Sequence, residues 1–337
     1  MIHQPEGVCA DFKIRNTLAT ESIATFGICA TSTEQIITAR EYAKKQRLKF
    51  IALGEGSNII SHKQVKALVC QISLQGIEIL HESKANVILE VAAGENWHRL
   101  VQHCTTKGWY GLENLSLIPG SVGAAPVQNI GAYGIEVASF IESVTILNER
   151  NEIQSLSAQA CGFSYRESIF KKCKDKIIVS VTMRLTKNPA VVIEYAELKY
   201  LLAKNKSSPT PADVASAVMA LRSAKLPDPQ MVPNVGSFFK NPVISSADAS
   251  RLRDQHPDLK MFHVGDGVKL SAAQLLDQAG WKERQEHGVK CWRMQPLVLT
   301  NSDNASAMEI LQFAETIQRN IQLKYGVALE LEPYELS

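Results

Sequence analysis

The feature that most constrains this chain is a segment rich in glycine, alanine and proline, GLENLSLIPGSVGAAPVQNIGAYGIE at 111–136. Small residues at this density allow one stretch of backbone to approach another, or a flat ligand, closely. Long loops inside compact domains tend to be functional or disordered. Apolar residues within the segment, among them Leu115, Ile118 and Ile130, argue against disorder. A plain surface loop is the alternative, and we predict a cofactor-binding loop.

A second glycine turn, GEGSN at 54–58, directly follows the apolar run KFIAL at 49–53. Two glycines separated by one residue can turn successive N–H groups into one concavity, which suits an anion such as pyrophosphate. The dinucleotide-binding GxGxxG pattern is absent, because Ile59 and Ile60 follow and read as a strand. A GxxxxGK[ST] phosphate loop is absent as well. By itself the turn is therefore compatible with phosphate binding and with a simple tight turn.

The apolar pattern predicts an α+β chain that begins with alternating strands and helices, becomes strand-rich and ends helix-rich. In the clearest helix, Trp97, Leu100, Val101 and Cys104 share one face, Cys104 as a packing residue, and Gly108 ends it. The other expected helices cover 32–48, 210–221, 246–255, 271–279 and 305–324. Expected strands cover 22–30, 49–53, 66–73, 76–80, 86–94, 177–185 and 297–300, with a pair over 140–157 and a surface connection over 186–210.

Length and composition give broader limits. The chain has 337 residues, enough for two or three domains, and no apolar run of the ~20 residues that a membrane span needs. The amino terminus does not read as a secretory signal, so we expect a cytoplasmic protein. A net charge of +2 gives no sign of a nucleic-acid-binding surface. The seven cysteines are odd in number and never form a CxxC pair, which argues against a disulfide framework and a metal site.

Five motifs occur in an order that matches a known family. They are GEGSN at 54–58, the segment at 111–134, YRESIFK at 165–171, NVGSFFKNP at 234–242 and a glutamate near the carboxyl end. Together they resemble the UDP-N-acetylenolpyruvoylglucosamine reductases, also called UDP-N-acetylmuramate dehydrogenases. The resemblance runs from about Asn16 to Glu332, and Tyr195 suggests the subgroup in which a tyrosine loop closes over the substrate.

The resemblance implies a fold and an activity. The family has a two-part FAD-binding region of the vanillyl-alcohol-oxidase type and a separate α+β substrate-binding domain. In this chain the expected parts are 1–74 with 326–337, then 75–226, and finally 227–325. The implied reaction is reduction of UDP-N-acetylglucosamine enolpyruvate by NADPH through non-covalent FAD, in peptidoglycan synthesis and thus in cell-wall biogenesis, cell shape and cell division. The implied partner is this small-molecule substrate, and we expect a monomer.

Three residues correspond to the family's catalytic positions: Arg166, Ser237 and Glu332. A guanidinium offers paired donors and a permanent charge to an anion that develops on the substrate carboxylate. A neutral glutamic acid could donate to the same anion, and a positioned hydroxyl could deliver a proton to the neighbouring carbon. The plain alternatives are a surface ion pair for Arg166 and a turn residue for Ser237.

The position of the glutamate is less tightly fixed than the other two. Relatives continue past it with Val-Arg and a glycine, whereas this chain reads PYELS and stops. The register favours Glu332 over Glu330 or Glu335.

The resemblance also implies binding residues. The expected FAD contacts are Gly54, Glu55, Gly56, Ser57, Asn58, Pro119, Gly120, Gly123, Ala124, Asn129, Gly131, Ala132 and Tyr133. Expected substrate contacts are Tyr195, Lys225, Asn241, Lys282 and Gln295, although each lysine could equally be a solvated surface charge. Ala124 and Ala125 stand where some relatives carry serines, which leaves backbone N–H groups to bind phosphate there.

Two alternatives remain open. One is a different flavin enzyme on the same fold, such as a sugar or lactone oxidase, against which NVGSFFKNP and YRES argue. The other is a nucleotide-binding protein without catalysis, which the presence of all three candidate catalytic residues disfavours.

Overall fold

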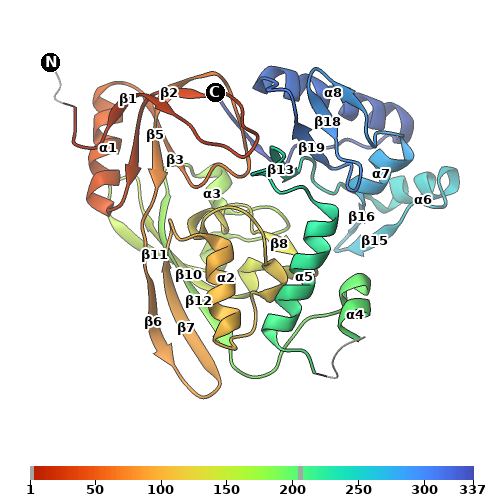
Figure 1. Ribbon diagram of the computed structural model, residues 1–337, viewed down its shortest axis with the longest axis horizontal. Coiled ribbons are helices and arrows are strands. Elements are labelled where there is room, and N and C mark those ends of the chain that lie inside the picture. Colours follow the sequence, from red (N-terminus) through yellow and green to blue (C-terminus); the bar gives the residue numbers. More distant parts are fainter. Residues whose placement is uncertain (1–3, 204–207) are drawn as a thin grey trace. The chain divides into compact units, whose positions relative to one another are not determined.

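The computed structural model describes residues 4–203 and 208–337, and its backbone divides into two compact units (Figure 1). Unit 1 contains the described parts of Met1–Lys13, Ala24–Gly56 and Lys66–Arg222. Unit 2 contains Ile14–Ile23, Ser57–Val65 and Ser223–Ser337. Short pieces of the amino-terminal region therefore belong with the carboxyl-terminal half of the chain.

The first sheet of unit 1 has the order β1-β2-β5-β3. Its strands are β1 (Cys9–Lys13), β2 (Ile23–Ala30), β3 (Lys49–Leu53) and β5 (Gln64–Ile72). Strand β3 pairs in parallel with β5, and α1 (Thr33–Lys45) connects β2 to β3. The Ser32 side chain caps α1 by accepting from the Gln35 amide, and Ile36, Ala39 and Tyr42 are buried in the same core as β5.

The second sheet of unit 1 is antiparallel where its pairings are described, with the order β11-β10-β12-β7-β6. Its strands are β6 (Ile77–Glu82), β7 (Asn86–Ala92), β10 (Ile141–Leu147), β11 (Ile153–Ser157) and β12 (Ile177–Thr186). Helix α2 (Trp97–Thr106) follows β7 and buries Trp97, Leu100, Val101 and Cys104, as its spacing predicts. The glycine-rich segment lies after α2 and contains a two-residue hairpin, β8 (Gly131–Ala132) and β9 (Ile135–Glu136). Helix α3 (Ile169–Lys172) precedes β12.

The 186–210 stretch departs from the expectation of a surface connection. Its described part contains α4 (Ala196–Ala203), which buries Leu198 and Leu202 against α5 (Pro211–Lys225). The two leucines stand four residues apart and so share one helix face. The expectation was wrong because the lysines, serines and prolines around α4 hide this short apolar stripe.

Unit 2 contains several short strands around three helices. The strands are β4 (Ile59–Ser61), β13 (Asn234–Ser237), β14 (Val243–Ser245), β15 (Met261–Val264), β16 (Gly267–Leu270), β17 (Gln285–Glu286), β18 (Val289–Cys291), β19 (Val298–Asn301) and β20 (Tyr334–Leu336). The helices are α6 (Ser246–Gln255), α7 (Ala272–Gln278) and α8 (Ala307–Tyr325). Expected helices at 246–255, 271–279 and 305–324 are confirmed, whereas of the strands after 230 only the one at 297–300 was expected.

Helix α8 supplies much of the core of unit 2. Ser306 and Glu309 form a reciprocal capping box at its start, and Gly326 ends it in the left-handed conformation. Phe313, which is 1% exposed, meets the Trp281 ring edge-on with a centroid separation of 5.7 Å. All seven cysteines are free. Among the described helices, none combines the length and apolarity that crossing a membrane requires.

Replacing Phe313 with alanine should therefore lower the free energy of unfolding by about 3–5 kcal/mol, because it leaves a cavity beside Trp281. Leu323 lies on the same helix but is 82% exposed, so its replacement by alanine should change stability by no more than about 0.5 kcal/mol. Chemical denaturation of both variants measures the difference. Similar losses in the two variants would show that the Phe313 face of α8 is not the buried one.

Candidate functional site

The two glycine-containing loops contact each other within unit 1. A Cβ atom added to Gly54, at the end of β3, would lie 2.5 Å from Ser121 Oγ. A Cβ added to Gly123 would lie 2.5 Å from the Ala93 Cβ. At Gly123 the neighbouring atoms are the Cβ and backbone of Ala93, so the backbone approaches as closely as only glycine permits. At Gly54 the neighbouring atom is the hydroxyl at the end of the Ser121 side chain. The first turn and the glycine-rich segment therefore form one surface.

The amino-terminal end of α2 holds this surface together. Asn96 caps α2 by accepting from the Arg99 amide, and its Nδ2 donates to Glu55 Oε1 at 2.8 Å. The Val122 amide donates to Glu95 O, and the Gly123 amide donates to Ala93 O, both at 2.8 Å. The residues from Gly120 to Ala124 are thus fixed against the strand end, and no bulky side chain separates them. The Ala124 and Ala125 amides also donate within the chain, to Ser121 O and Val122 O, so the expectation that their N–H groups bind phosphate is not supported. The glycine-lined surface instead allows a flat or anionic ligand to approach the backbone closely.

The second half of the glycine-rich segment turns through residues in the left-handed conformation. Asn129 (φ 45°) donates to Glu136 Oε2 at 2.7 Å and accepts from the Ala138 amide. Tyr133 (φ 49°) forms the turn between β8 and β9, and its ring meets the exposed Tyr195 edge-on at 5.1 Å. The candidate cofactor residue Tyr133 and the candidate substrate residue Tyr195 are therefore in contact within unit 1.

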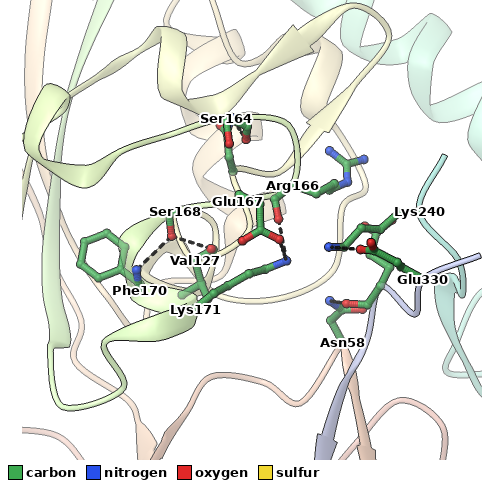
Figure 2. Close-up of polar contacts among 12 residues, drawn as sticks. Asn58, Val127, Ser164, Arg166, Glu167, Ser168, Phe170, Lys171, Lys240 and Glu330 are labelled. Carbon is green, nitrogen blue, oxygen red and sulfur yellow. Dashed lines mark hydrogen bonds and ion pairs between the residues drawn. The ribbon is translucent and has the colours of Figure 1, made fainter. Parts of the chain in front are cut away.

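Arg166 lies against the same segment. Its Nη2 donates to Gly131 O at 3.1 Å, and its own carbonyl accepts from Lys171 Nζ at 2.5 Å (Figure 2). Ser168 caps α3 and donates to Val127 O at 2.6 Å, which ties the YRES loop to the glycine-rich segment. Arg166 also has a left-handed backbone (φ 56°), a conformation that costs a non-glycine residue free energy and often marks functional positions.

In unit 2, Ser237 is exposed at the end of β13 between well-fixed neighbours. Phe238 and Phe239 are 0% and 1% exposed, so the chain on its carboxyl side is anchored in the core. On its amino side, the Gly236 amide (φ 73°) donates to Asn234 Oδ1 at 2.8 Å, and the pairing of β13 with β19 shifts register between Asn234 and Ser237. This irregularity, together with Gly236, presents the hydroxyl outward on a rigid backbone.

Glu332 lies next to Ser237 through main-chain pairing. Its amide donates to Phe238 O at 3.0 Å, and Phe239 forms an isolated bridge with Leu331. Of the two neighbouring glutamates, Glu330 pairs with Lys240 (Figure 2), and Glu335 Oε1 accepts from His62 Nε2 at 2.6 Å. The structure therefore brings Ser237 and Glu332 together.

The other predicted residues of unit 2 differ in the groups that their polar atoms contact. Asn58 donates to Glu332 O at 3.3 Å, and the Ser57 carbonyl accepts from Thr17 Oγ1. Asn241 Oδ1 accepts from the Ala272 amide at the start of α7. The exposed Lys282 pairs with Asp277 at 2.7 Å.

Two polar atoms in one loop of unit 2 lack partners. Gln295 Oε1 and Trp292 Nε1 are both buried, and neither has a hydrogen-bond partner among the described residues. Of these two residues, only Gln295 was predicted. Lys225, the last residue of α5, is half-buried.

Reasoning from the sequence also missed a polar group in unit 1. Arg222 on α5 donates to Leu117 O, and the Leu117 amide donates to His98 Nδ1 at 3.1 Å. Burial, followed by the nearby Arg222 charge, lowers the pKa of His98, which agrees with an imidazole that accepts at Nδ1. Burial likewise raises the pKa of the Glu113 carboxyl at the start of the segment. Nothing in the residue spacing signals this group, because its members are far apart in the chain.

Comparison with known proteins agrees with this geometry. A family model described as an FAD binding domain matches residues 25–157, and one described as the UDP-N-acetylenolpyruvoylglucosamine reductase C-terminal domain matches residues 228–335. A reductase of this name from Pseudomonas syringae pv. syringae is 39% identical over 333 residues, covering 95% of this chain and 98% of its own. The chain belongs to the UDP-N-acetylenolpyruvoylglucosamine reductase family.

Further relatives support the family assignment and the fold. The Chromobacterium violaceum member is 44% identical over 287 residues, 83% of this chain and 84% of its own. The crystal structure of the reductase (MurB) from Thermus caldophilus superposes with a TM-score of 0.67 at 21% identity and covers 98% of both chains. The expected fold class, an α+β protein with an FAD-binding region and a separate carboxyl-terminal domain, is confirmed, as is the expectation of an FAD-containing oxidoreductase.

The close approach at Gly54 can be tested through FAD affinity. Gly54→Ala should weaken FAD binding about tenfold, because the new methyl group would displace the Ser121 hydroxyl from its position beside the end of β3. In Gly54→Ala/Ser121→Ala the colliding oxygen is gone, so most of the affinity should return. Fluorescence titration of the apoproteins with FAD measures both effects. A double variant no better than Gly54→Ala would show that contact with Ser121 is not the reason for the glycine.

Proposed function

We propose that this protein reduces UDP-N-acetylglucosamine enolpyruvate to UDP-N-acetylmuramate with NADPH, through non-covalently bound FAD, in peptidoglycan precursor synthesis. The observation that carries the proposal is the pairing of an FAD-binding domain at 25–157 with the reductase-specific domain at 228–335 in one chain. The contact of Ser237 and Glu332 through Phe238 supports it independently. The protein would act as a cytoplasmic monomer.

Bound FAD would supply the hydride chemistry, accepting hydride from NADPH and passing it to the terminal vinyl carbon of the substrate. The glycine-containing loops are suited to hold the cofactor by close packing against their backbone. We assign this role to Gly54, Glu55, Gly56, Ser57, Asn58, Pro119, Gly120, Gly123, Ala124, Asn129, Gly131, Ala132 and Tyr133. In this proposal, FAD binds to two parts of the chain, 1–74 with 326–337 and 75–226. The substrate binds to the third part, 227–325.

Arg166, Glu332 and Ser237 would act on the enolpyruvyl group. Hydride addition to the vinyl terminus moves negative charge onto the carboxylate, as an enolate. Arg166 balances that charge with a rigid fork of donors, and a protonated Glu332 can donate a hydrogen bond to it. Ser237 then gives its proton to the carbon beside the carboxylate, which requires the fixed position that the buried phenylalanines provide.

The remaining predicted residues would bind the sugar nucleotide. Lys225 and Lys282 supply positive charge for the diphosphate, and Asn241 and Tyr195 supply hydrogen bonds. Gln295 has the strongest structural support, because its buried Oε1 has no partner among the described residues and can accept from a ligand N–H.

Anaerobic stopped-flow absorbance tests the function. The yellow holoprotein is mixed with NADPH and then with UDP-N-acetylglucosamine enolpyruvate. Bleaching by NADPH and fast recovery of colour only with this sugar nucleotide are the expected results. Bleaching without recovery would keep the reduction of the flavin by NADPH and reject the substrate. Rapid recovery of colour when air is then admitted would favour a sugar or lactone oxidase. A protein that stays colourless with added FAD would be a binding protein without flavin chemistry.

Ser237→Ala should separate the two half-reactions. Reduction of the flavin by NADPH should stay within about twofold of the parent, whereas reoxidation by the enolpyruvyl substrate should slow by at least about 10²-fold, the typical contribution of a general acid. Ser302→Ala, at an exposed serine of the same unit, is the matched control and should leave both steps unchanged. Equal slowing of both half-reactions by Ser237→Ala would overturn the proton-donor role.

The assignment of Glu332 can be tested against its two neighbours. Glu332→Ala should slow reoxidation strongly, while Glu332→Gln should retain more of the rate, because an amide still donates a hydrogen bond. Glu330→Gln and Glu335→Gln change glutamates whose own side chains are exposed and should stay near the parent rate. Single-turnover rates of the four variants decide the register, and a larger effect at either neighbouring glutamate would move the role to that residue.

A further inference from the structure

The side chain of Asn114 joins two stretches of unit 1 that are far apart in the sequence. Asn114 lies in the glycine-rich segment and is 1% exposed. Its Nδ2 donates to Tyr133 O and to Val192 O, both at 2.9 Å. Tyr133 lies in the turn between β8 and β9, and Val192 lies in the chain between β12 and α4, which we call the 187–195 connection. One amide group thus holds both stretches.

The 187–195 connection has few other attachments near Val192. It belongs to no helix or strand. Val191 and Ile193 pack against the small core that α4 and α5 share, whereas Ala190 and Val192 border a cleft of about 320 Å³. Among the described residues, the bond from Asn114 is the one hydrogen bond found for the chain from 189 to 193. Open space on one side therefore makes this bond important for the position of the connection.

The bond lies close to the residue that we assign to the sugar nucleotide. Tyr195 follows Val192 by three residues, and its ring meets the Tyr133 ring edge-on at 5.1 Å. Asn114 therefore holds the backbone of one ring and the chain that leads to the other. Asn114 Oδ1 is buried without a hydrogen-bond partner among the described residues, and such an acceptor lowers stability. An asparagine here is thus better explained by what its two donors hold than by the stability of the core.

We propose that Asn114 is a positioning residue for substrate binding, which acts by holding the 187–195 connection so that Tyr195 meets the sugar nucleotide. Without the two donors, the chain at Val192 can move toward the cleft, and the Tyr195 hydroxyl spends less time where the ligand needs it. Binding of the sugar nucleotide should then weaken, while reduction of the flavin by NADPH should not change. The inference rests on the role of Tyr195 in the proposed function.

The first experiment observes the connection without any substrate. A single 3-fluorotyrosine at position 195 reports the contact with the Tyr133 ring by fluorine NMR. In the FAD-loaded Asn114→Ala and Asn114→Leu variants, the signal should narrow at least about twofold and move toward that of free fluorotyrosine, because the ring becomes more mobile. Asn188→Ala, at an exposed asparagine of the same connection, is the matched control and should leave the signal unchanged.

The second experiment measures the consequence for the reaction. In both Asn114 variants, KM for UDP-N-acetylglucosamine enolpyruvate should rise about tenfold, with kcat and FAD affinity within about twofold of the parent. Pairing of β8 with β9 still holds the Tyr133 turn, so the cofactor should be little affected. In Tyr195→Phe/Asn114→Ala, KM should stay within about twofold of Tyr195→Phe alone, because the hydroxyl that Asn114 positions is already absent.

Each other outcome overturns the proposal. An unchanged fluorine signal would show that Asn114 does not hold the connection, and KM effects that multiply in the double variant would show that it does not act through Tyr195. A loss of FAD affinity as large as the rise in KM would assign Asn114 to the cofactor turn. Failure of both Asn114 variants to fold would assign it to the fold.

The two measurements also separate this inference from the proposed function. The fluorine signal requires neither NADPH nor the sugar nucleotide. A changed signal in a protein that does not turn over this substrate would reject the proposed function and leave the attachment of the connection to Asn114 intact. Turnover with an unchanged signal would reject the role of Asn114 alone.

Discussion

The close approach of backbone to backbone is the constraint on which unit 1 depends. At Gly94 an added Cβ would lie 2.5 Å from the Leu74 amide nitrogen, and the equivalent atoms on Gly54 and Gly123 would collide with Ser121 and Ala93. These distances leave no room for side chains between the strand ends and the glycine-rich segment. The segment is therefore ordered by direct main-chain contact, and hydrogen bonds such as that from the Gly123 amide to Ala93 O hold it at 2.8 Å. Its composition is a steric requirement of the surface that it forms.

Two arginines of unit 1 meet this segment in different electrostatic settings. Arg166 is held by a strained loop, with its side chain on Gly131 O and its own carbonyl on Lys171. Arg222 comes from a regular helix and is desolvated, with an incomplete set of hydrogen bonds. The first arrangement is compatible with the proposed contact of Arg166 with an anionic substrate. The two side chains thus differ in their hydrogen-bond partners, although both are half-buried.

Elements with a strong, long apolar period were predictable from the sequence, and short ones were not. Helix α2, with Trp97 and Cys104 on its buried face, and the capped helix α8 follow directly from their spacing. The short strands of unit 2 carry too few residues for an alternating pattern, and α4 is marked only by Leu198 and Leu202. Among site residues, the spacing identified the glycine loops, whereas Arg166, Ser237 and Glu332 came from family resemblance. The Nε of Arg222, which has no hydrogen-bond partner among the described residues, could not be predicted. Whether a donor finds an acceptor depends on how the chain packs.

The proposed role of Ser237 as a proton donor depends on its position. A serine hydroxyl has no tendency to release its proton in water, so its contribution depends on being held where a strong base is formed. Buried Phe238 and Phe239 follow it directly, and the Asn234 side chain fixes Gly236 before it, so the backbone at Ser237 has little freedom although its side chain is exposed. The amide of Glu332 is tied to the Phe238 carbonyl, which places the two candidate groups on one rigid support. In the proposed role, the exposed side chain would be accessible to the substrate, and the buried flanking residues would fix its position. Both are needed for proton donation by a hydroxyl.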